Sequence, residues 1–450
     1  CAGRRRQGDE RLMSGDIDFF LSTGEREQGA VRALTDLFEH CAAENVSDIH
    51  MEGLDDNRVE IRLREGNALR HYGYLSRGDA RQAELKIRSR AQMSMTDMRR
   101  EMDGRFMQRA GGRRFDVRVN ILPTIVGTSI VMRLLDSQKA GMSLAQLDMP
   151  PDIEAAYLDA LRSAEGMILN TGPTKSGKTM TLYAGMAVLN RPDQKIITIE
   201  DPVEGRLAGA QQVQVGGGTG RSFASALRAV LRQNPNAVLV GEMRDPETAS
   251  IGVEASLFGS ILLSSTHANS AVLTPLRLHK LGVDYYTIGA ALLAVMAQRL
   301  PDRLCNSCAI QRDPTHLERE LFISEGIALD SATFRDAVGC PHCKGTGYRG
   351  MVPIFEFLRI SDQPEAVDCI DDRLRLAEVA RKQPQYRTLR QDALRQIAAG
   401  KTTIRACGRS VTSLQYDVGD ERDEAASGLS SGVSPGNQDV QPSQPSLQRL

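Results

Sequence analysis

The sequence has few of the residues that bind nucleic acid by stacking. It contains no tryptophan, 11 phenylalanines and 9 tyrosines among 450 residues, and aromatic rings are the platforms on which single-stranded bases stack. Its 56 basic and 57 acidic residues leave a formal net charge of -1, so the chain as a whole offers no counterion-release surface for DNA. A local basic patch stays open as an alternative. We therefore expect no direct binding of nucleic acid.

The sequence also lacks an apolar run long enough to cross a membrane. The best run, residues 288–297, is about half of the roughly 20 residues that a spanning helix needs, and we interpret it as a buried helix. The charged N-terminus has no apolar segment and begins with Cys1 instead of Met, so no signal peptide is visible. We expect a truncated N-terminus in preference to a mature lipoprotein, and a protein that is not integral to the membrane.

The chain contains only eight cysteines, and four of them lie in C-x-x-C motifs. Four of the eight cysteines form two C-x-x-C pairs, Cys305 with Cys308 and Cys340 with Cys343. Two such pairs in a chain without an export signal favour a metal site in a reducing cytoplasm over disulfides. Four thiolates suit a closed, tetrahedral Zn²⁺ site with a structural role. Because the spacer, residues 309–339, is longer than in compact zinc ribbons, four free buried thiols are the alternative.

The first part of the chain is predicted to hold a small domain. Residues 1–29 are polar and are predicted to be loose. Residues 30–140 combine a helical stretch with alternating polar and apolar segments, such as 58–64 and 115–119, and this alternation is typical of half-buried strands. We interpret the region as a small α+β domain. The turn-rich stretch 141–155 is predicted to be a linker.

The second part, residues 156–406, is predicted to be a mainly parallel α/β domain. Continuous apolar runs typical of strands buried on both faces alternate there with helical stretches, at 167–169, 196–199, 237–240 and 261–263. The active site is expected at the carboxyl ends of these strands. The cysteine pairs lie in the segment 301–350, and residues 374–400 are predicted to be helical. Residues 407–450 are predicted to be a disordered tail, since their last part is rich in Ser, Gln, Pro and Gly.

One motif in the α/β domain has the pattern G-x-x-x-x-G-K-[ST] of a phosphate loop. It follows an apolar run and precedes a helical stretch, which is the order that presents backbone N–H groups to a β-phosphate at a helix N-terminus. Lys178 is predicted to reach the β- and γ-phosphates of ATP, and Thr179 to bind Mg²⁺. A chance match in a loop is the alternative. The residues predicted to bind the nucleotide are Gly172, Pro173, Thr174, Lys175, Ser176, Gly177, Lys178 and Thr179.

Carboxylates follow two of the other predicted strands. Glu200 and Glu204 lie in the segment E-D-P-V-E after the run 196–199, and Glu242 follows the run 237–240. Metal-assisted phosphoryl transfer needs one acidic group to hold Mg²⁺ through water and another to orient the attacking water. Acids at these strand ends therefore favour a catalytic site, and an ordinary turn is the alternative for E-D-P.

A histidine, His267, follows the last predicted strand. A lone histidine is more often structural or merely exposed, but at a strand's carboxyl end it can sense the γ-phosphate or polarise a carboxylate. Arg244 and Asp245 come directly after Glu242. They are equally compatible with a structural ion pair and with a nucleotide contact.

Together, these motifs resemble the type II secretion and type IV pilus assembly ATPase family. The resemblance rests on G-P-T-x-S-G-K-T, I-T-I-E-D-P-V-E, V-L-V-G-E-M-R-D, the segment around His267, A-Q-R-L (297–300) and the paired cysteines, and in the small domain on segments that include S-D-I-H (47–50). It implies an α/β fold: a RecA-like P-loop ATPase domain with a smaller N-terminal α+β domain and a C-terminal zinc-binding and helical segment. It also implies a cytoplasmic homo-hexamer, peripheral at the inner membrane, that docks on a platform protein and uses ATP hydrolysis to insert pilin-like subunits.

The resemblance also implies roles for single residues. The acidic box, Walker B and histidine box match positions named above, and two arginines match residues that reach the nucleotide across a domain or subunit boundary. The residues matched to catalysis are Glu204, Glu242, His267, Arg118 and Arg133, with Glu200 in the nucleotide site. One departure concerns Lys175, which replaces a usual glycine of the phosphate loop and is expected either to strain the turn or to add a phosphate contact.

The paired cysteines favour assembly or secretion over pilus retraction, since retraction motors of this family generally lack them. Two other functions are alternatives: a DNA-uptake or conjugation-type ATPase of the same superfamily, and a nucleotide-gated ring scaffold that does not hydrolyse ATP. The motifs leave open whether the driven polymer is a pilus, a secretion pseudopilus or a DNA-uptake fibre.

Overall fold

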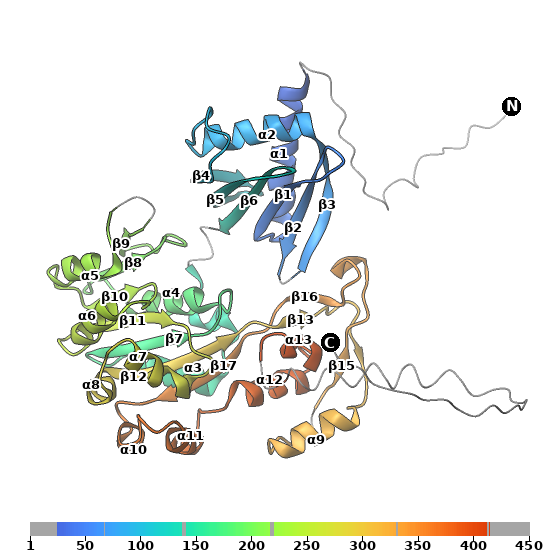
Figure 1. Cartoon of the computed structure of the whole chain (residues 1–450). Coiled ribbons are helices and arrows are strands. Elements are labelled where there is room, and N and C mark those ends of the chain that lie inside the picture. The colour runs from blue at the N-terminus through green and yellow to red at the C-terminus, as the bar shows by residue number, and fades with distance from the viewer. Residues whose placement is uncertain are drawn as a thin grey trace, which may run out of the picture.

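The structure is a computed structural model that describes residues 25–66, 68–136, 141–216, 220–329, 332–411 and 414. A small N-terminal domain is followed by a larger α/β domain, from which a cysteine-containing segment and several C-terminal helices extend (Figure 1). Among the described helices, none combines the length and the apolar character needed to cross a bilayer.

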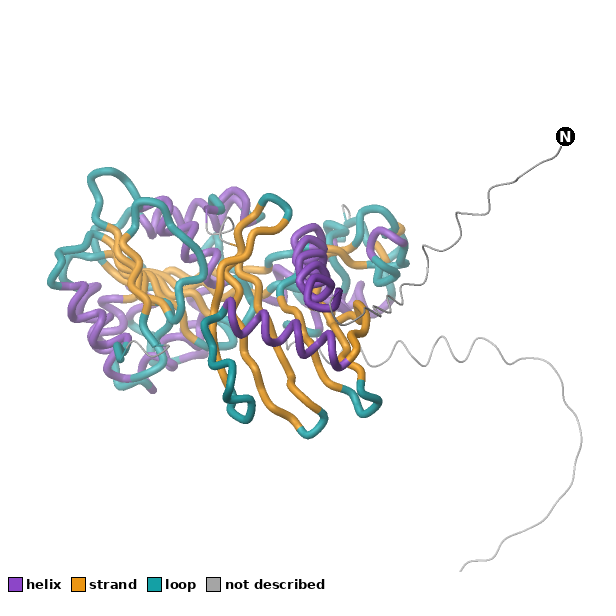
Figure 2. Tube along the Cα trace, turned by 90° about the horizontal axis from the view of Figure 1, so that it is seen from above, coloured by secondary structure: helices purple, strands orange, loops and turns teal. Residues whose placement is uncertain are grey.

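The small domain is built on an antiparallel six-stranded sheet in the order β3-β2-β1-β6-β5-β4. Helices α1 and α2 cross each other and pack against the sheet (Figure 2). In β2, Ile61 and Leu63 are buried and Arg62 between them is more exposed, which confirms the predicted alternation. The elements are α1 (Glu25–Glu44), β1 (Asp48–Gly53), β2 (Arg58–Glu65), β3 (Ala68–Ser76), α2 (Arg77–Arg90), β4 (Met102–Ala110), β5 (Arg113–Thr124) and β6 (Gly127–Asp136).

The larger domain contains a seven-stranded sheet in the order β17-β12-β7-β11-β10-β8-β9. All its neighbouring strands are parallel except β17, which runs antiparallel to β12 at one edge. The strands are β7 (Gly166–Thr171), β8 (Ile196–Glu200), β9 (Gln211–Gln214), β10 (Ala237–Val240), β11 (Ile261–Thr266), β12 (Leu292–Arg299) and β17 (Ile354–Arg359). The helices are η2 (Leu144–Leu147), α3 (Pro151–Leu161), α4 (Lys178–Leu189), α5 (Phe223–Leu231), α6 (Pro246–Ser256), η3 (Ala271–Leu273), α7 (Thr274–Lys280) and α8 (Tyr285–Ala291).

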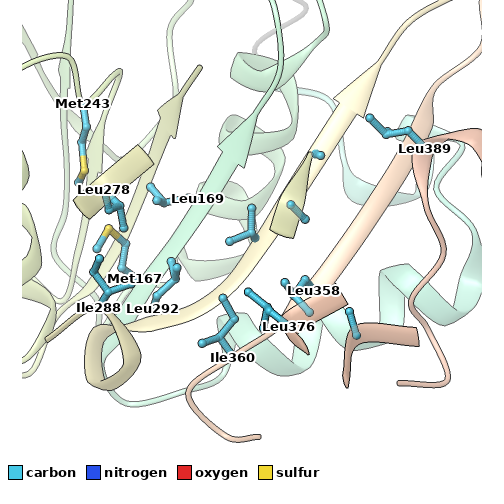
Figure 3. Close-up of a cluster of buried hydrophobic side chains, with 14 of the residues drawn as sticks. Met167, Leu169, Met243, Leu278, Ile288, Leu292, Leu358, Ile360, Leu376 and Leu389 are labelled. Carbon is cyan, nitrogen blue, oxygen red and sulfur yellow. The ribbon is translucent and has the colours of Figure 1, made fainter. Parts of the chain in front are cut away.

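Apolar side chains cover both faces of this sheet. Met167 and Leu169 belong to a core on one face, and Ile168 between them belongs to a second core on the other face. Figure 3 shows the first core, with Met167 and Leu169 among the labelled side chains. Burial on both faces explains why these strands are continuous apolar runs in the sequence.

The cysteine-containing segment leaves the sheet at the end of β12 and returns to it at β17. It consists of short elements, β13 (Asp302–Leu304), β14 (Ile310–Gln311), α9 (His316–Ser324), β15 (Arg335–Asp336), η4 (Pro341–Cys343) and β16 (Tyr348–Met351). The C-terminal helices follow as α10 (Pro364–Val367), α11 (Arg373–Lys382), α12 (Leu389–Ala398) and α13 (Ile404–Gly408).

The interpretation of residues 288–297 as one buried helix is wrong. Helix α8 ends at Ala291, and Leu292 begins the strand β12. This strand is buried along its whole length, between β7 and β17. A segment that is apolar on every side has neither helical nor strand periodicity, so its pattern did not reveal the change from helix to strand.

Residues 374–400 form two helices instead of one. Helix α11 ends at Lys382 and α12 begins at Leu389. Pro384 follows the end of α11, and proline disfavours helical backbone at the residue before it. That residue, Gln383, is buried and exchanges two hydrogen bonds with the backbone of Arg359, its Oε1 accepting at 3.1 Å and its Nε2 donating at 2.9 Å.

Three predicted segment limits differ from the element bounds. Helix α1 begins at Glu25, within the segment predicted to be loose, and residues 1–24 lie outside the described residues. Helix α3 begins at Pro151, inside the predicted linker, because proline is well suited to the first turn of a helix. Helix α13 runs to Gly408, and Val411 is buried in the core. The predicted tail therefore begins too early, and most of it lies outside the described residues.

Candidate functional site

The phosphate-loop motif joins β7 to α4, as predicted. Gly177 has a backbone φ of 88°, in the left-handed region that favours glycine. A Cβ atom at Gly177 would lie 2.7 Å from Nε2 of Gln298 on β12, which leaves no room for a side chain. Gln298 is itself held in place, because its Oε1 accepts a hydrogen bond of 2.8 Å from the Thr181 hydroxyl on α4. Gln298 on strand β12 thus packs against the phosphate loop at Gly177.

Lys178 is the first residue of α4 and points back over the loop. Its Nζ donates hydrogen bonds to the carbonyl oxygens of Gly172 at 2.7 Å and Pro173 at 3.0 Å. Burial lowers the pKa of Lys178 to about 8, although Glu242 opposes the shift. The positive end of the α4 dipole faces the same place. This arrangement concentrates positive potential where a phosphate group can bind.

Glu242 and His267 lie in contact at the carboxyl ends of β10 and β11. The Nε2 atom of His267 is 2.9 Å from a Glu242 carboxylate oxygen, and its Nδ1 is 3.0 Å from the carbonyl oxygen of Gly172. Arg244 donates to the other Glu242 oxygen at 2.7 Å. Asp245 instead caps α6 by accepting from the Thr248 backbone N–H at 2.9 Å. The structure therefore separates two residues that the sequence left undecided: Arg244 lines the cleft described below, and Asp245 is structural.

The two acids after β8 have different surroundings. Glu200 is buried and accepts hydrogen bonds from the hydroxyl groups of Tyr183 and Thr198. Burial and the charge of Glu200 raise the pKa of Tyr183. Glu204 is half-exposed and lies 3.6 Å from the Arg118 guanidinium. Burial raises the pKa of Glu204, and the charge of Arg118 opposes that shift.

The predicted arginines come from the small domain of the same chain. Arg118 on β5 and Arg133 on β6 are register partners. The Nη2 atom of Arg118 is 3.5 Å from the backbone oxygen of Val203, and Nε of Arg133 donates to Asp48 at 2.9 Å. Arg118 therefore contacts the larger domain, whereas Arg133 is held by a residue of its own domain.

These groups line one cleft of about 600 Å³ between the two domains. A volume of this size lies in the range of small-molecule and cofactor sites. The Ser176 hydroxyl in the loop is buried without a hydrogen-bond partner among the described residues. The predicted residues that line the cleft are Thr174 to Thr179, Glu200, Glu204, Glu242, His267, Arg118 and Arg133. Gly172 and Pro173 contact Lys178 through their carbonyl groups.

The four paired cysteines converge at one point. Their Sγ atoms all lie within 4.8 Å of one another, and the contacts between them include 4.0 Å for Cys305–Cys340 and 3.7 Å for Cys308–Cys343. These separations are too long for disulfides and close to the ~3.8 Å edge of a sulfur tetrahedron around zinc with Zn–S bonds of ~2.3 Å. The Gly347 backbone N–H also donates to Cys343 Sγ at 3.1 Å, as expected around a thiolate ligand. The cluster fits a structural zinc ion.

The loop after the cysteines also reaches the small domain. The Nζ atom of Lys344 lies 2.7 Å from a Glu65 carboxylate oxygen and 3.3 Å from one of Glu44. The Lys344 backbone oxygen accepts from Arg70 at 3.3 Å. The small domain therefore lines the cleft and also contacts the cysteine-containing segment (Figure 1).

Comparison with known proteins decides the family. The sequence profile described as "Type II/IV secretion system protein" matches residues 24–409. The chain belongs to this family. It is 37% identical over 399 residues to type II secretion system protein HxcR of Pseudomonas aeruginosa, covering 88% of this chain and 80% of HxcR. Type II secretion system protein E of Aeromonas hydrophila is 35% identical over 404 residues, with coverage of 87% and 80%.

The chain is also similar to a pilus assembly ATPase and to two ATPases of known structure. The type IV pilus assembly ATPase PilB of Thermus thermophilus is 35% identical over 381 residues, which are 84% of this chain and 42% of PilB. Among solved structures, the ATPase DotB of Legionella pneumophila has a TM-score of 0.63 at 20% identity, with coverage of 88% and 96%. The pilus retraction motor PilT has a TM-score of 0.60 at 21% identity, with coverage of 87% and 98%. These two structures support the fold of this family member.

Three residues of the site were not assigned from the sequence. Asp48 and Gln298 lie in two segments that resemble the family, S-D-I-H and A-Q-R-L. The sequence therefore pointed to these segments but did not indicate what the two residues do. Tyr183 gave no signal, because a tyrosine in an apolar helix is indistinguishable from an ordinary core residue. Its contact with Glu200 depends on how α4 packs against the sheet.

Proposed function

We propose that this family member is a cytoplasmic, Mg²⁺-dependent ATPase that powers assembly of a type IV pilus or a type II secretion pseudopilus at the inner membrane. The main support for the proposal is that the phosphate loop, Glu242, His267 and two arginines of the small domain line the same cleft. Family membership and the relatives named as secretion proteins and as a pilus assembly ATPase support the same conclusion.

The cleft residues divide the work of phosphoryl transfer. Backbone N–H groups of the phosphate loop and Lys178 bind the β- and γ-phosphates, for which Lys178 exchanges its carbonyl partners. Glu242 orients the attacking water and accepts its proton, while His267 fixes the Glu242 carboxylate. Arg118 and Arg133 stabilise negative charge on the γ-phosphate. A bound Mg²⁺ ion, held by Thr179, would neutralise charge on the β- and γ-phosphates.

We also propose a homo-hexamer that docks on an inner-membrane platform protein, and one structural Zn²⁺ ion on Cys305, Cys308, Cys340 and Cys343. The family supports the ring and the partner, and the converging Sγ atoms support the metal. The paired cysteines favour assembly or secretion over retraction. Zinc bound by four thiolates has no open position for catalysis, so its role here is to hold a loop-rich segment together.

ATP hydrolysis and oligomer mass, measured on the same preparation of the full chain, test the proposed function. We expect turnover that needs Mg²⁺, disappears in Lys178→Ala, and occurs in the fractions whose mass corresponds to six chains. The alanine removes the cation that contacts the phosphates. Nucleotide binding without turnover, in preparations that form the ring, would favour the non-hydrolysing scaffold. Salt-dependent binding of DNA would favour the conjugation-type alternative.

The affinity for ATP is expected to fall as the pH rises above 8. Lys178, with its pKa of about 8, loses its proton above that pH in the nucleotide-free protein. ATP phosphates favour the charged form, so binding then takes up a proton and weakens by up to about tenfold per pH unit. Titration with a non-hydrolysable ATP analogue between pH 7 and pH 9.5 measures the effect. Lys178→Arg, which stays charged throughout this range, is expected to bind with a flat pH profile, and a wild-type profile just as flat would contradict the prediction.

A further inference from the structure

Lys175 occupies a backbone conformation that does not favour a side chain. Its φ is 67°, in the left-handed region where a Cβ atom meets the following carbonyl oxygen. Glycine adopts this conformation without that strain. A lysine at this position therefore needs a compensating interaction, and the structure supplies one outside the loop.

The side chain of Lys175 leaves the phosphate loop and reaches the small domain. Its Nζ lies 3.2 Å from Oδ2 of Asp48 on β1. The Asp48 side chain is only 3% exposed, and that of Lys175 is 46% exposed. A buried carboxylate at the edge of a cleft thus receives a cation from the other domain.

Asp48 binds cations of both domains with one carboxylate. Arg133 donates to its Oδ1 at 2.9 Å, the Ser47 hydroxyl donates to its Oδ2 at 2.8 Å, and Arg64 lies 3.6 Å from Oδ2. Burial alone would raise the pKa of Asp48, but the hydrogen bonds from Arg133 and Ser47 and the charge of Lys175 hold it below its ordinary value. The carboxylate is therefore an anionic bridge between the phosphate loop and Arg133.

Other contacts between the domains are placed differently. Arg118 is 3.6 Å from Glu204, and Arg105 donates to Gln214 at 2.8 Å in an exposed contact outside the cleft lining. The pair of Lys344 with Glu65 lies near the Asp48 carboxylate, because Glu65 follows Arg64, the register partner of Asp48. Because these contacts do not involve Lys175, its loss is expected to loosen the small domain against the phosphate loop without detaching it.

We propose that Lys175 is a positioning residue that acts through Asp48 to hold Arg133 and the small domain against the phosphate loop before nucleotide binds. The inference rests on the proposed function, since it takes the cleft to be the ATP site. A triphosphate in the cleft carries negative charge to the same two cations. Nucleotide therefore replaces Asp48 as the anion that keeps the domains together, and a chain without Lys175 depends more strongly on bound nucleotide to stay closed.

The test measures the distance between the two domains by fluorescence resonance energy transfer in the full chain. Fluorophores on non-natural amino acids at Asp55 and Arg191, both exposed, avoid the native cysteines. Without nucleotide, Lys175→Gly is expected to increase the ratio of open to closed molecules about fivefold, the size of effect typical of a partly exposed ion pair. A non-hydrolysable ATP analogue is expected to restore the wild-type distance.

Two further variants separate charge from backbone strain. Lys175→Arg keeps the strained φ and the positive charge, so it is expected to stay closed, whereas Lys175→Glu faces the Asp48 carboxylate and is expected to open more than the glycine variant. High salt is expected to move the wild-type distance toward that of Lys175→Gly. A thermal unfolding curve for each variant checks that the domains remain folded.

Equal distances in wild type, Lys175→Gly and Lys175→Glu without nucleotide would overturn the inference. So would an arginine variant as open as the glycine variant, because the charge would then have no role. The distance measurement does not depend on ATP hydrolysis, so a protein without ATPase activity can still show the expected distances. Conversely, an active ATPase with unchanged distances would refute the positioning role and leave the proposed function intact.

Discussion

Replacing Glu242 with glutamine is expected to lower ATP turnover by about 10²- to 10³-fold while nucleotide binding is retained. The glutamine amide has nearly the size of the carboxylate but cannot accept a proton from water. It also removes a negative charge close to Lys178, so ATP affinity is expected to stay equal or rise. Steady-state hydrolysis and equilibrium binding of ATP, measured on the same preparation, separate the two effects.

Glu247→Gln is the matched control for this substitution. Glu247 lies five residues further along, on the exposed surface of α6, where it pairs with Arg228 at 2.7 Å. This variant is expected to hydrolyse ATP at the wild-type rate. If Glu242→Gln also kept full turnover and Glu204→Gln lost it, the attacking water would be oriented by Glu204, which lies beside Arg118.

Loss of one paired cysteine is expected to remove the metal and to destabilise the α/β domain. Wild-type protein should contain about one zinc ion per chain, and Cys343→Ser close to none, because three thiolates hold structural zinc far more weakly than four. A loss of about 3 kcal/mol of metal-linked stability corresponds to a fall of roughly 6–12 °C in the unfolding midpoint. Elemental analysis of undenatured protein and thermal unfolding measure the two effects.

Cys369→Ala serves as the control for the zinc prediction. The Cys369 thiol is buried and contacts the backbone oxygen of Glu365 at 3.0 Å, outside the cysteine cluster. Its replacement is expected to leave the zinc content unchanged. Zinc-free wild-type protein with a normal unfolding midpoint would contradict the proposed metal site and support four free thiols.

Local patterns in the sequence predicted the parts of the site that lie on parallel strands. Gly172, Glu242 and His267 each follow a buried apolar run, and parallel strands bring their carboxyl ends to one edge of a sheet. Two C-x-x-C pairs likewise predicted the cysteine cluster, because thiols at that spacing have few other uses in a reducing compartment.

Contacts between distant segments did not follow from the sequence. Lys175 was expected to strain the turn or to bind phosphate, and its left-handed φ confirms the strain. Its pairing with Asp48, 127 residues away, depends on how two domains pack, which no local pattern encodes. Glu200 shows the same limit: it was predicted beside the nucleotide, and it does line the cleft, but its carboxylate also accepts from the Tyr183 and Thr198 hydroxyl groups.

Strand β12 also has a mechanical consequence. It lies between β7 and β17, Gln298 near its end packs beneath the phosphate loop, and the chain then continues directly to Cys305. A strand is already close to the full extension of a polypeptide, so it cannot lengthen under load. A pull on the cysteine-containing segment would therefore be passed as a displacement to the phosphate loop. The same strand would carry movements of the phosphate loop outward to the cysteine-containing segment.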